Sequence, residues 1–131
     1  MSSAERTYPE PAINMETEAY WEAANKNILL LKKCEACGET HFYPRAICPN
    51  CFSSDTVWYE ASGKGKIYSF SIMRRAEIPY VIAYVTLAEG VTMMSNIVDC
   101  DFDSLEIDQD VEVTFKTAEG GQAVPLFRPI Q

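Results

Sequence analysis

Residues 34–51 read CEACGETHFYPRAICPNC and contain four of the five cysteines in the 131-residue chain. The cysteines form two Cys-x-x-Cys pairs, Cys34 with Cys37 and Cys48 with Cys51, separated by ten residues. A Cys-x-x-Cys turn directs both thiolates at one centre, and two such turns complete a tetrahedron of four sulfurs. This spacing predicts a metal site, with Zn²⁺ as the expected ion and iron of the rubredoxin kind as the alternative.

We expect the metal at this site to hold the chain together rather than to catalyse a reaction. A catalytic zinc keeps one coordination position open, whereas four cysteine ligands fill all four positions. His41 is the only histidine and lies inside the loop. Because no cysteine ligand is missing, we expect His41 to pack or to lie on the surface. Four cysteines without a metal are the remaining alternative.

The composition is that of a globular protein with an acidic surface. Hydrophobic residues make up 47% of the chain and charged residues 23%, both ordinary values for this class. Acidic residues outnumber basic residues 19 to 11, and the resulting net charge of −8 repels nucleic acid. No apolar run reaches the roughly 20 residues of a membrane helix, and the N-terminus lacks the apolar core of a secretory signal. We therefore expect a cytoplasmic protein that binds neither nucleic acid nor a membrane.

The chain before the cysteines predicts an extended arm followed by one helix, together residues 1–27. Two prolines favour the extended arm, and the stretch NMETEAYWEAANKN favours an amphipathic helix of about three turns. Asn14 is the expected N-cap. The expected apolar face carries Met15, Ala19 and Ala23, with Tyr20 and Ala24 beside them and Trp21 adding bulk. Short strands are expected on both sides of the cysteines, so that the predicted zinc ribbon covers residues 28–60.

The remainder of the chain, residues 61–131, predicts five short strands. Their sequences are GKGKIYSFSIMRR, PYVIAYVTLAEG, VTMMSNIVDC, DVEVTFKTAEGG and QAVPLFRPI, with DFDSLEI between the third and the fourth. This pattern favours a small five-stranded barrel of the OB type, so the predicted fold class is mainly β. The stretch YVIAYVTL (80–87) is apolar on both faces, although a barrel has only one interior. We expect the arm, the helix, the ribbon or a partner subunit to cover its outer face.

The sequence lacks the residue patterns of a self-sufficient enzyme. Acyl transfer needs an activated Ser or Cys beside a base, and no Gly-x-Ser-x-Gly turn is present. Cys100 lies between Asp99 and Asp101, whose charges raise the pKa of a thiol and weaken it as a nucleophile. The stretch GKGKIYS lacks the full pattern of a phosphate-binding loop. We expect that the chain is not an enzyme on its own.

The order of these segments resembles the DUF35 family. The helix is followed by LLLKKCEACGETHFYPRAICPNCFSSDTVWYEASGKGKIYSFSIMRR, PYVIAYVTLAEGVTMMSNIVDCD, DVEVTF and VPLFRP, a match over about residues 15–129. The stretches YPRAICPNC, SGKGKIYSFS and PLFRP are its most specific parts. One departure is Asp108, at a position where relatives often have glycine.

The resemblance implies an OB-fold, acyl-CoA-associated protein with a rubredoxin-like zinc ribbon. Members of the family are small non-catalytic subunits that work with a thiolase-like enzyme or an acyl-CoA hydratase. The four paired cysteines match the family's zinc ligands. Because the chain carries no fused hydratase domain, the expected partner is a separate thiolase-like catalytic subunit, in a hetero-oligomer that could contain two copies of each.

The resemblance further implies that the chain helps to form or cover an acyl-CoA site, with a CoA thioester at the interface with the partner. The enzyme would cleave or condense β-ketoacyl-CoA thioesters. The basic residues available for CoA phosphates are Lys64, Lys66, Arg74, Arg75 and Arg45, and ordinary surface charge explains each of them equally well. The alternatives left open are a subunit of an acyl-CoA hydratase or aldolase, a module that binds single-stranded nucleic acid, and an iron-containing electron carrier.

Overall fold

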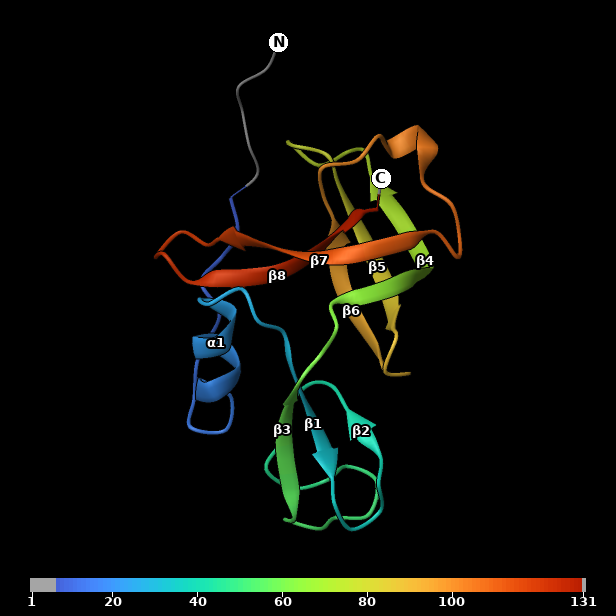
Figure 1. Ribbon diagram of the computed structural model, residues 1–131. Coiled ribbons are helices and arrows are strands. Elements are labelled where there is room, and N and C mark those ends of the chain that lie inside the picture. The colour runs from blue at the N-terminus through green and yellow to red at the C-terminus, as the bar shows by residue number, and fades with distance from the viewer. Residues whose placement is uncertain (1–6, 131) are drawn as a thin grey trace.

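The computed structural model describes residues 7–130 and contains a short helix, a small three-stranded sheet and a closed barrel (Figure 1). The elements are α1 (Glu18–Ala24), β1 (Leu30–Cys34), β2 (Thr40–His41), β3 (Thr56–Glu60), β4 (Lys64–Met73), β5 (Tyr80–Leu87), β6 (Thr92–Ile97), the 3-10 helix η1 (Phe102–Ser104), β7 (Asp110–Thr117) and β8 (Ala123–Pro129). The predicted mainly β fold, with one N-terminal helix, a cysteine-rich ribbon and a five-stranded barrel, is confirmed.

The helix α1 is shorter than predicted, and only part of its predicted apolar side is buried. Asn14 caps the turn before the helix: its Oδ1 accepts the backbone N–H of Thr17, and the Thr17 hydroxyl accepts the backbone N–H of Asn14. Met15 is 95% exposed, so its assignment to the apolar face was wrong. Tyr20, Ala24 and Trp21, which were expected beside that face, are buried, and the two large rings cover most of the apolar surface there.

The small sheet has the order β2-β1-β3, with antiparallel pairing on both sides of β1. Leu31 of β1 is buried and belongs to the same hydrophobic cluster as Tyr20 of α1 and Ile67 of the barrel. Helix α1 contacts both β1 and β8. One core cluster therefore joins the helix, the small sheet and the barrel. The predicted domain boundary between residues 60 and 61 stays a prediction.

The barrel is closed in the order β4-β5-β6-β8-β7. All strand pairs are antiparallel except β6 with β8, which pair in parallel at Ile97 and Phe127. Closure leaves no unpaired sheet edge in the barrel, and buried residues such as Val85, Val111 and Phe127 fill its interior. Across residues 7–130, no helix is long and apolar enough to cross a bilayer.

The N-terminal arm and α1 form hydrogen bonds with the hairpin that joins β7 to β8. The Glu10 carboxylate accepts the backbone N–H of Gly120 at 2.6 Å, and the side chain of Gln122 donates to the backbone oxygen of Trp21 at 2.9 Å. Asn25 accepts the backbone N–H of Ala123 at 2.9 Å. These hydrogen bonds fix the arm and the helix against one end of the barrel (Figure 1).

The strand β5 directs alternate residues into and out of the barrel. Val81, Ala83 and Val85 are buried, as the alternation of a strand requires, whereas Tyr84 on the opposite face is 47% exposed. The arm, α1 and the ribbon therefore leave part of this outer face open within residues 7–130. Its coverage by a partner subunit stays a prediction.

Candidate functional site

The four paired cysteines converge at the end of the small sheet that lies away from the barrel. The Sγ atoms of Cys34, Cys37, Cys48 and Cys51 all lie within 4.8 Å of one another. Cys34 and Cys48 are buried, and Cys37 and Cys51 are exposed. Two turns ten residues apart in the sequence thus bring four soft ligands to one centre, which is the donor set of a structural zinc site.

The two Cys-x-x-Cys turns have the same backbone geometry. The backbone N–H of Gly38 donates to the carbonyl oxygen of Cys34 at 2.8 Å, and that of Phe52 donates to the carbonyl oxygen of Cys48 at 2.9 Å. The residue after the second cysteine has a positive φ in both turns, 80° at Gly38 and 67° at Phe52. Glycine adopts this conformation freely, whereas an aromatic residue is strained there.

Hydrogen bonds around the sulfurs favour thiolates. The backbone N–H of Asn50 donates to Cys48 Sγ at 3.3 Å, and its side-chain Nδ2 donates to Cys37 Sγ at 3.6 Å. The Asn50 side chain is the main reason that the pKa of Cys37 is lowered to about 6, and the backbone at Glu39 adds to this effect. Asn50 was not singled out in the sequence analysis; its place between Cys48 and Cys51 is the signal that identifies it.

The pKa of Cys51 in the same cluster is shifted in the opposite direction. The backbone at Ser53 lowers the pKa of Cys51, but hydrogen bonding to Cys34 and burial raise it by more, to about 12. The pKa values of Cys37 and Cys51 thus shift in opposite directions, because the close sulfurs hydrogen-bond to one another. A bound dication favours the thiolate form of all four sulfurs, so the residues fit a Zn²⁺ ion.

His41 and Arg45 lie in the loop between the two cysteine pairs. His41 is 7% exposed, and neither of its ring nitrogens has a hydrogen-bond partner of good geometry. Burial lowers the pKa of His41, so the ring is neutral at pH 7. The position of His41 fits the packing role expected for it, whereas Arg45 is exposed.

The structure separates four of the five basic residues considered for CoA phosphates, all except Arg45, into two groups. Lys64 and Lys66 begin β4, whereas Arg74 and Arg75 follow its end, so that about 30 Å of extended strand lies between the groups. Three of the four form ion pairs, at N–O distances of 3.6 Å for Lys64–Glu112, 2.8 Å for Lys66–Asp110 and 3.2 Å for Arg74–Asp103. A single phosphate therefore cannot contact both the lysines and the arginines.

Lys64 and Lys66 line a pocket of about 440 Å³. Ile67, Tyr68 and Leu87 contribute to its wall. The pocket therefore combines apolar surface with two lysines and the carboxylates of Asp108 and Asp110. This arrangement suits an amphipathic ligand better than a free phosphate.

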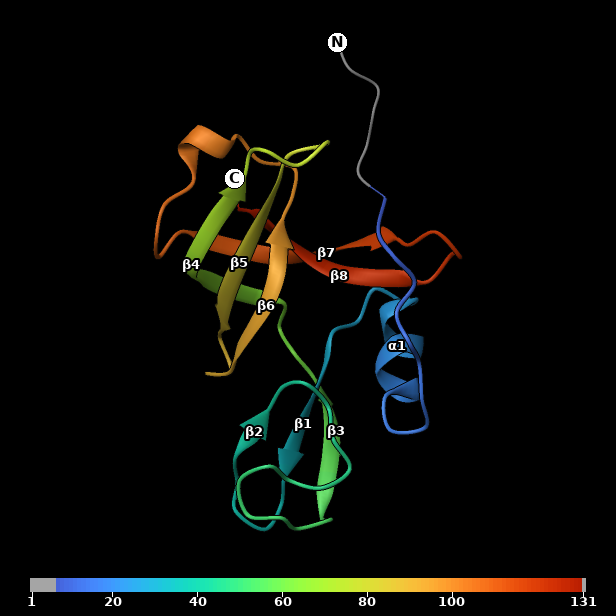
Figure 2. The same cartoon turned by 180° about the vertical axis from the view of Figure 1, so that it is seen from behind.

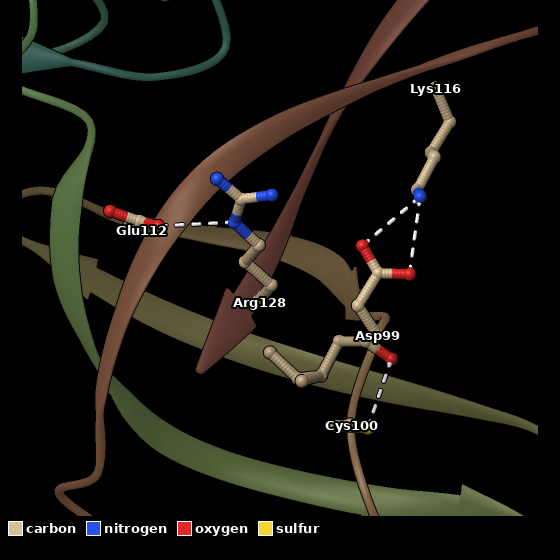
Figure 3. Close-up of polar contacts among 6 residues, drawn as sticks. Asp99, Cys100, Glu112, Lys116 and Arg128 are labelled. Carbon is tan, nitrogen blue, oxygen red and sulfur yellow. Dashed lines mark hydrogen bonds and ion pairs between the residues drawn. The ribbon is translucent and has the colours of Figure 1, made fainter. Parts of the chain in front are cut away.

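Cys100 lies beside an ion pair at another pocket of the barrel (Figure 3). Lys116 reaches both carboxylate oxygens of Asp99, at 3.2 and 3.1 Å. Burial raises the pKa of the Cys100 thiol, and the charges of Asp101 and Asp99 raise it further. The direction agrees with the sequence-based expectation that Cys100 is a weak nucleophile.

Comparison with known proteins places the chain in a family. The model "ChsH2, rubredoxin-like zinc ribbon domain" matches residues 21–57, and "ChsH2, C-terminal OB-fold domain" matches residues 58–116. A "DUF35 domain-containing scaffold protein" from Methanothermobacter thermautotrophicus is 42% identical over 98 residues, which are 69% of this chain and 74% of that protein. The chain belongs to the DUF35 family. Its resemblance to DUF35 proteins in sequence is thereby confirmed.

Other similar proteins carry the names of enzymes or enzyme subunits. A solved chain from "Ltp2-ChsH2(DUF35) aldolase" superimposes with a TM-score of 0.80 at 34% identity, covering 92% of this chain and 98% of that one. A "Probable enoyl-CoA hydratase alpha subunit" from Thermomonospora curvata is 35% identical over 92% of this chain, which spans only 40% of that protein. "Benzoylsuccinyl-CoA thiolase subunit BbsA" from Geobacter metallireducens is 31% identical, over 63% of this chain and 58% of that protein.

Proposed function

We propose that this chain is a non-catalytic scaffold subunit of a thiolase-type acyl-CoA enzyme. It binds the catalytic subunit and helps to form or cover the acyl-CoA site. The observation that carries the scaffold role is the likeness to the DUF35 chain of Ltp2-ChsH2 aldolase along 98% of that chain, at a TM-score of 0.80. A relative named as a thiolase subunit supports the thiolase type.

We further propose that Cys34, Cys37, Cys48 and Cys51 hold a structural Zn²⁺ ion. The close approach of the four sulfurs and the donors from Asn50 support this assignment. When bound, the ion supplies four ligand bonds at a tip of the ribbon that has little apolar core of its own. Its role is to fix the two loops, and no step of catalysis involves it.

For contact with CoA, Lys64 and Lys66 are the first candidates. Both line the apolar pocket of about 440 Å³, which has room for part of a pantetheine or acyl group. A phosphate would replace Asp110 and Glu112 as the partners of these lysines. Arg74 and Arg75 belong to the other end of β4 and would bind a different part of the ligand or of the partner.

An aldolase-type partner is the second candidate. The Ltp2-ChsH2 aldolase chain is covered over 98% of its length, whereas the thiolase subunit is covered over 58%. Both enzyme types cleave a carbon–carbon bond in an acyl-CoA, but their products differ. Thiolysis of a β-ketoacyl-CoA consumes CoA and gives two acyl-CoA molecules, whereas aldol cleavage of a β-hydroxyacyl-CoA gives one acyl-CoA and a free aldehyde or ketone.

The test is to purify the chain from its native host under mild conditions and to identify the subunit that binds it. The complex is then assayed with a β-ketoacyl-CoA plus CoA and, separately, with a β-hydroxyacyl-CoA. Two acyl-CoA products support the thiolase type, and a free carbonyl product supports the aldolase type. A chain that binds no acyl-CoA enzyme subunit would contradict the proposal.

A further inference from the structure

The outer side of the barrel between β4 and β6 carries an uncharged surface. Because paired residues of antiparallel strands point to the same side, Ser71, Ile82 and Asn96 form one row across the three strands, and Tyr84 pairs with Met94 in the next. We define the outer face as Ser71, Tyr80, Ile82, Tyr84, Met94 and Asn96. Figure 2 shows β4, β5 and β6 side by side, with neither α1 nor the ribbon in front of them.

The composition of the outer face differs from that of the chain as a whole. None of its six residues is charged, although 23% of the chain is. Tyr84 is 47% exposed and Met94 is 61% exposed, and they are direct neighbours across two strands. Single exposed apolar residues are ordinary, but adjacent Tyr and Met without charges are typical of the centre of a protein interface.

A shallow groove continues the outer face toward β8. It has a volume of about 290 Å³, and its walls include Ile82 and Met94 together with Pro125 and Leu126 of β8. A groove of this kind receives an apolar or aromatic side chain from a partner, as the central anchor positions of interfaces do.

Charge decides which partner fits. The connection before β5 carries Arg74, Arg75 and Glu77, the connection after it carries Glu89, and the chain has a net charge of −8. A second copy would bring the same net charge against this face, and the two copies would repel each other. The complementary partner is therefore a different polypeptide with an apolar centre.

We propose that the outer face is the surface that docks on the catalytic subunit of the acyl-CoA enzyme. The inference rests on the proposed function, and it adds the location and the chemistry of the interface. The apolar pair Tyr84 and Met94 forms its centre, and the groove beside Met94 receives an anchor side chain of the catalytic subunit.

The experiment measures binding of the co-purified catalytic subunit to three variants of the full chain. Tyr84→Lys and Met94→Lys place a charge at the centre of the outer face, and each is expected to weaken binding by about 30-fold or more. Met15→Lys makes the same change at a residue that is 95% exposed and lies outside the face, so binding stays at the wild-type level. Melting curves identify any variant that fails to fold.

Amide hydrogen exchange of the wild-type complex tests the location of the interface independently. We expect amides at the margins of β5 and β6, including the turn at Glu89, to exchange more slowly in the complex. Wild-type binding by both lysine variants, or slowed exchange confined to other strands, would overturn the inference while leaving the scaffold role intact. No binding by the wild-type chain would refute the proposed function itself. A homodimer in sedimentation that Met94→Lys dissociates would assign the face to a second copy instead.

Discussion

The ribbon and the barrel are stabilised by different means. In the ribbon, β2 has two residues and β1 and β3 have five each, and the distal end contains four cysteines in place of a hydrophobic cluster. In the barrel, five strands close on themselves, and aliphatic and aromatic side chains fill the interior. A site that binds a metal contributes its binding energy to folding, whereas a packed core contributes buried apolar area.

This difference predicts that the two parts respond to different perturbations. Removal of the metal ligands should open the loops that carry them and leave the barrel folded. Removal of core side chains should destabilise the barrel while the sulfurs still bind metal. The following changes test these expectations, beginning with the largest effect.

The first change is Cys48→Ser, with Cys100→Ser as the matched control. Cys48 is fully buried among the four sulfurs, so its loss should cost the ribbon several kcal/mol, on the order of the binding energy of one ligand in a structural zinc site. Amides of residues 34–58 should then exchange rapidly, while those of β5 and β7 remain protected. We expect bound zinc to fall from one ion per chain to none, and Cys100→Ser to retain it. Full zinc binding by the Cys48 variant would contradict a four-sulfur site.

The second change is Phe127→Ala in the barrel. Phe127 is fully buried and pairs with Ile97 where β6 and β8 close the barrel. Its truncation should lower the free energy of unfolding by about 3 to 5 kcal/mol, measured by denaturant titration. Zinc content should remain at one ion per folded chain. A parallel loss of zinc under native conditions would show that the ribbon and the barrel do not respond separately.

The third change compares the two cysteine turns. Phe52→Gly should raise the free energy of unfolding by about 1 kcal/mol, because glycine adopts the positive φ without strain. Phe52→Ala removes the ring, which is 78% exposed, but keeps the strained backbone, so it should bring no such gain. Gly38→Ala should cost about 1 kcal/mol in the other turn, where an added Cβ meets no neighbouring atom and only the backbone is strained. If all three variants had the same free energy of unfolding, the positive φ would not determine the stability of either turn.

The smallest effect concerns the fifth cysteine. With metal bound, Cys100 should be the one thiol that iodoacetamide modifies, and mass spectrometry should count one adduct on the native chain and five after unfolding with a chelator. Burial and the charges of Asp101 and Asp99 raise the pKa of Cys100, so its alkylation should reach half its maximal rate at a higher pH than in the unfolded chain. The double change Asp99→Asn and Asp101→Asn should lower that pH. An unchanged profile would show that the two carboxylates have no influence.

Much of the fold could be predicted from local sequence signals. The spacing of the cysteines predicted the ribbon, and alternation in DVEVTFKT predicted β7, which the structure has at Asp110–Thr117. The five predicted strands all form, since each has enough apolar residues between clear turn signals. The four sulfurs also come together as the spacing implies.

Features that depend on distant contacts could not be predicted in the same way. The buried face of α1 is set by packing against β1 and β8, and for that reason Tyr20 and Trp21 are buried while Met15 is exposed. The ion pairs of Lys64 and Lys66 involve β7, more than 40 residues later. The separation of Lys64 from Arg74 follows from the length of one predicted strand and was therefore accessible from the sequence.

Two residues with a positive φ lie between these extremes, because the sequence contained a signal for each that was only partly used. Asp108 has a φ of 69°, a conformation that glycine adopts freely. This backbone conformation accounts for the glycine expected at the position from the family resemblance. Phe52 has a φ of 67° and was overlooked, although it occupies the same place after Cys51 that Gly38 occupies after Cys37. Comparison of the two cysteine turns with each other would have identified it.

The central claim is that the chain acts through a catalytic subunit, and a titration tests it most directly. Increasing amounts of the purified chain are added to a fixed amount of the co-purified catalytic subunit, and cleavage of the acyl-CoA substrate is followed by the release of its products. We predict no turnover by the chain alone and a rate that rises with added chain until the complex is saturated. Turnover by the chain alone, or a catalytic subunit whose rate and substrate range do not change when the chain binds, would contradict the claim.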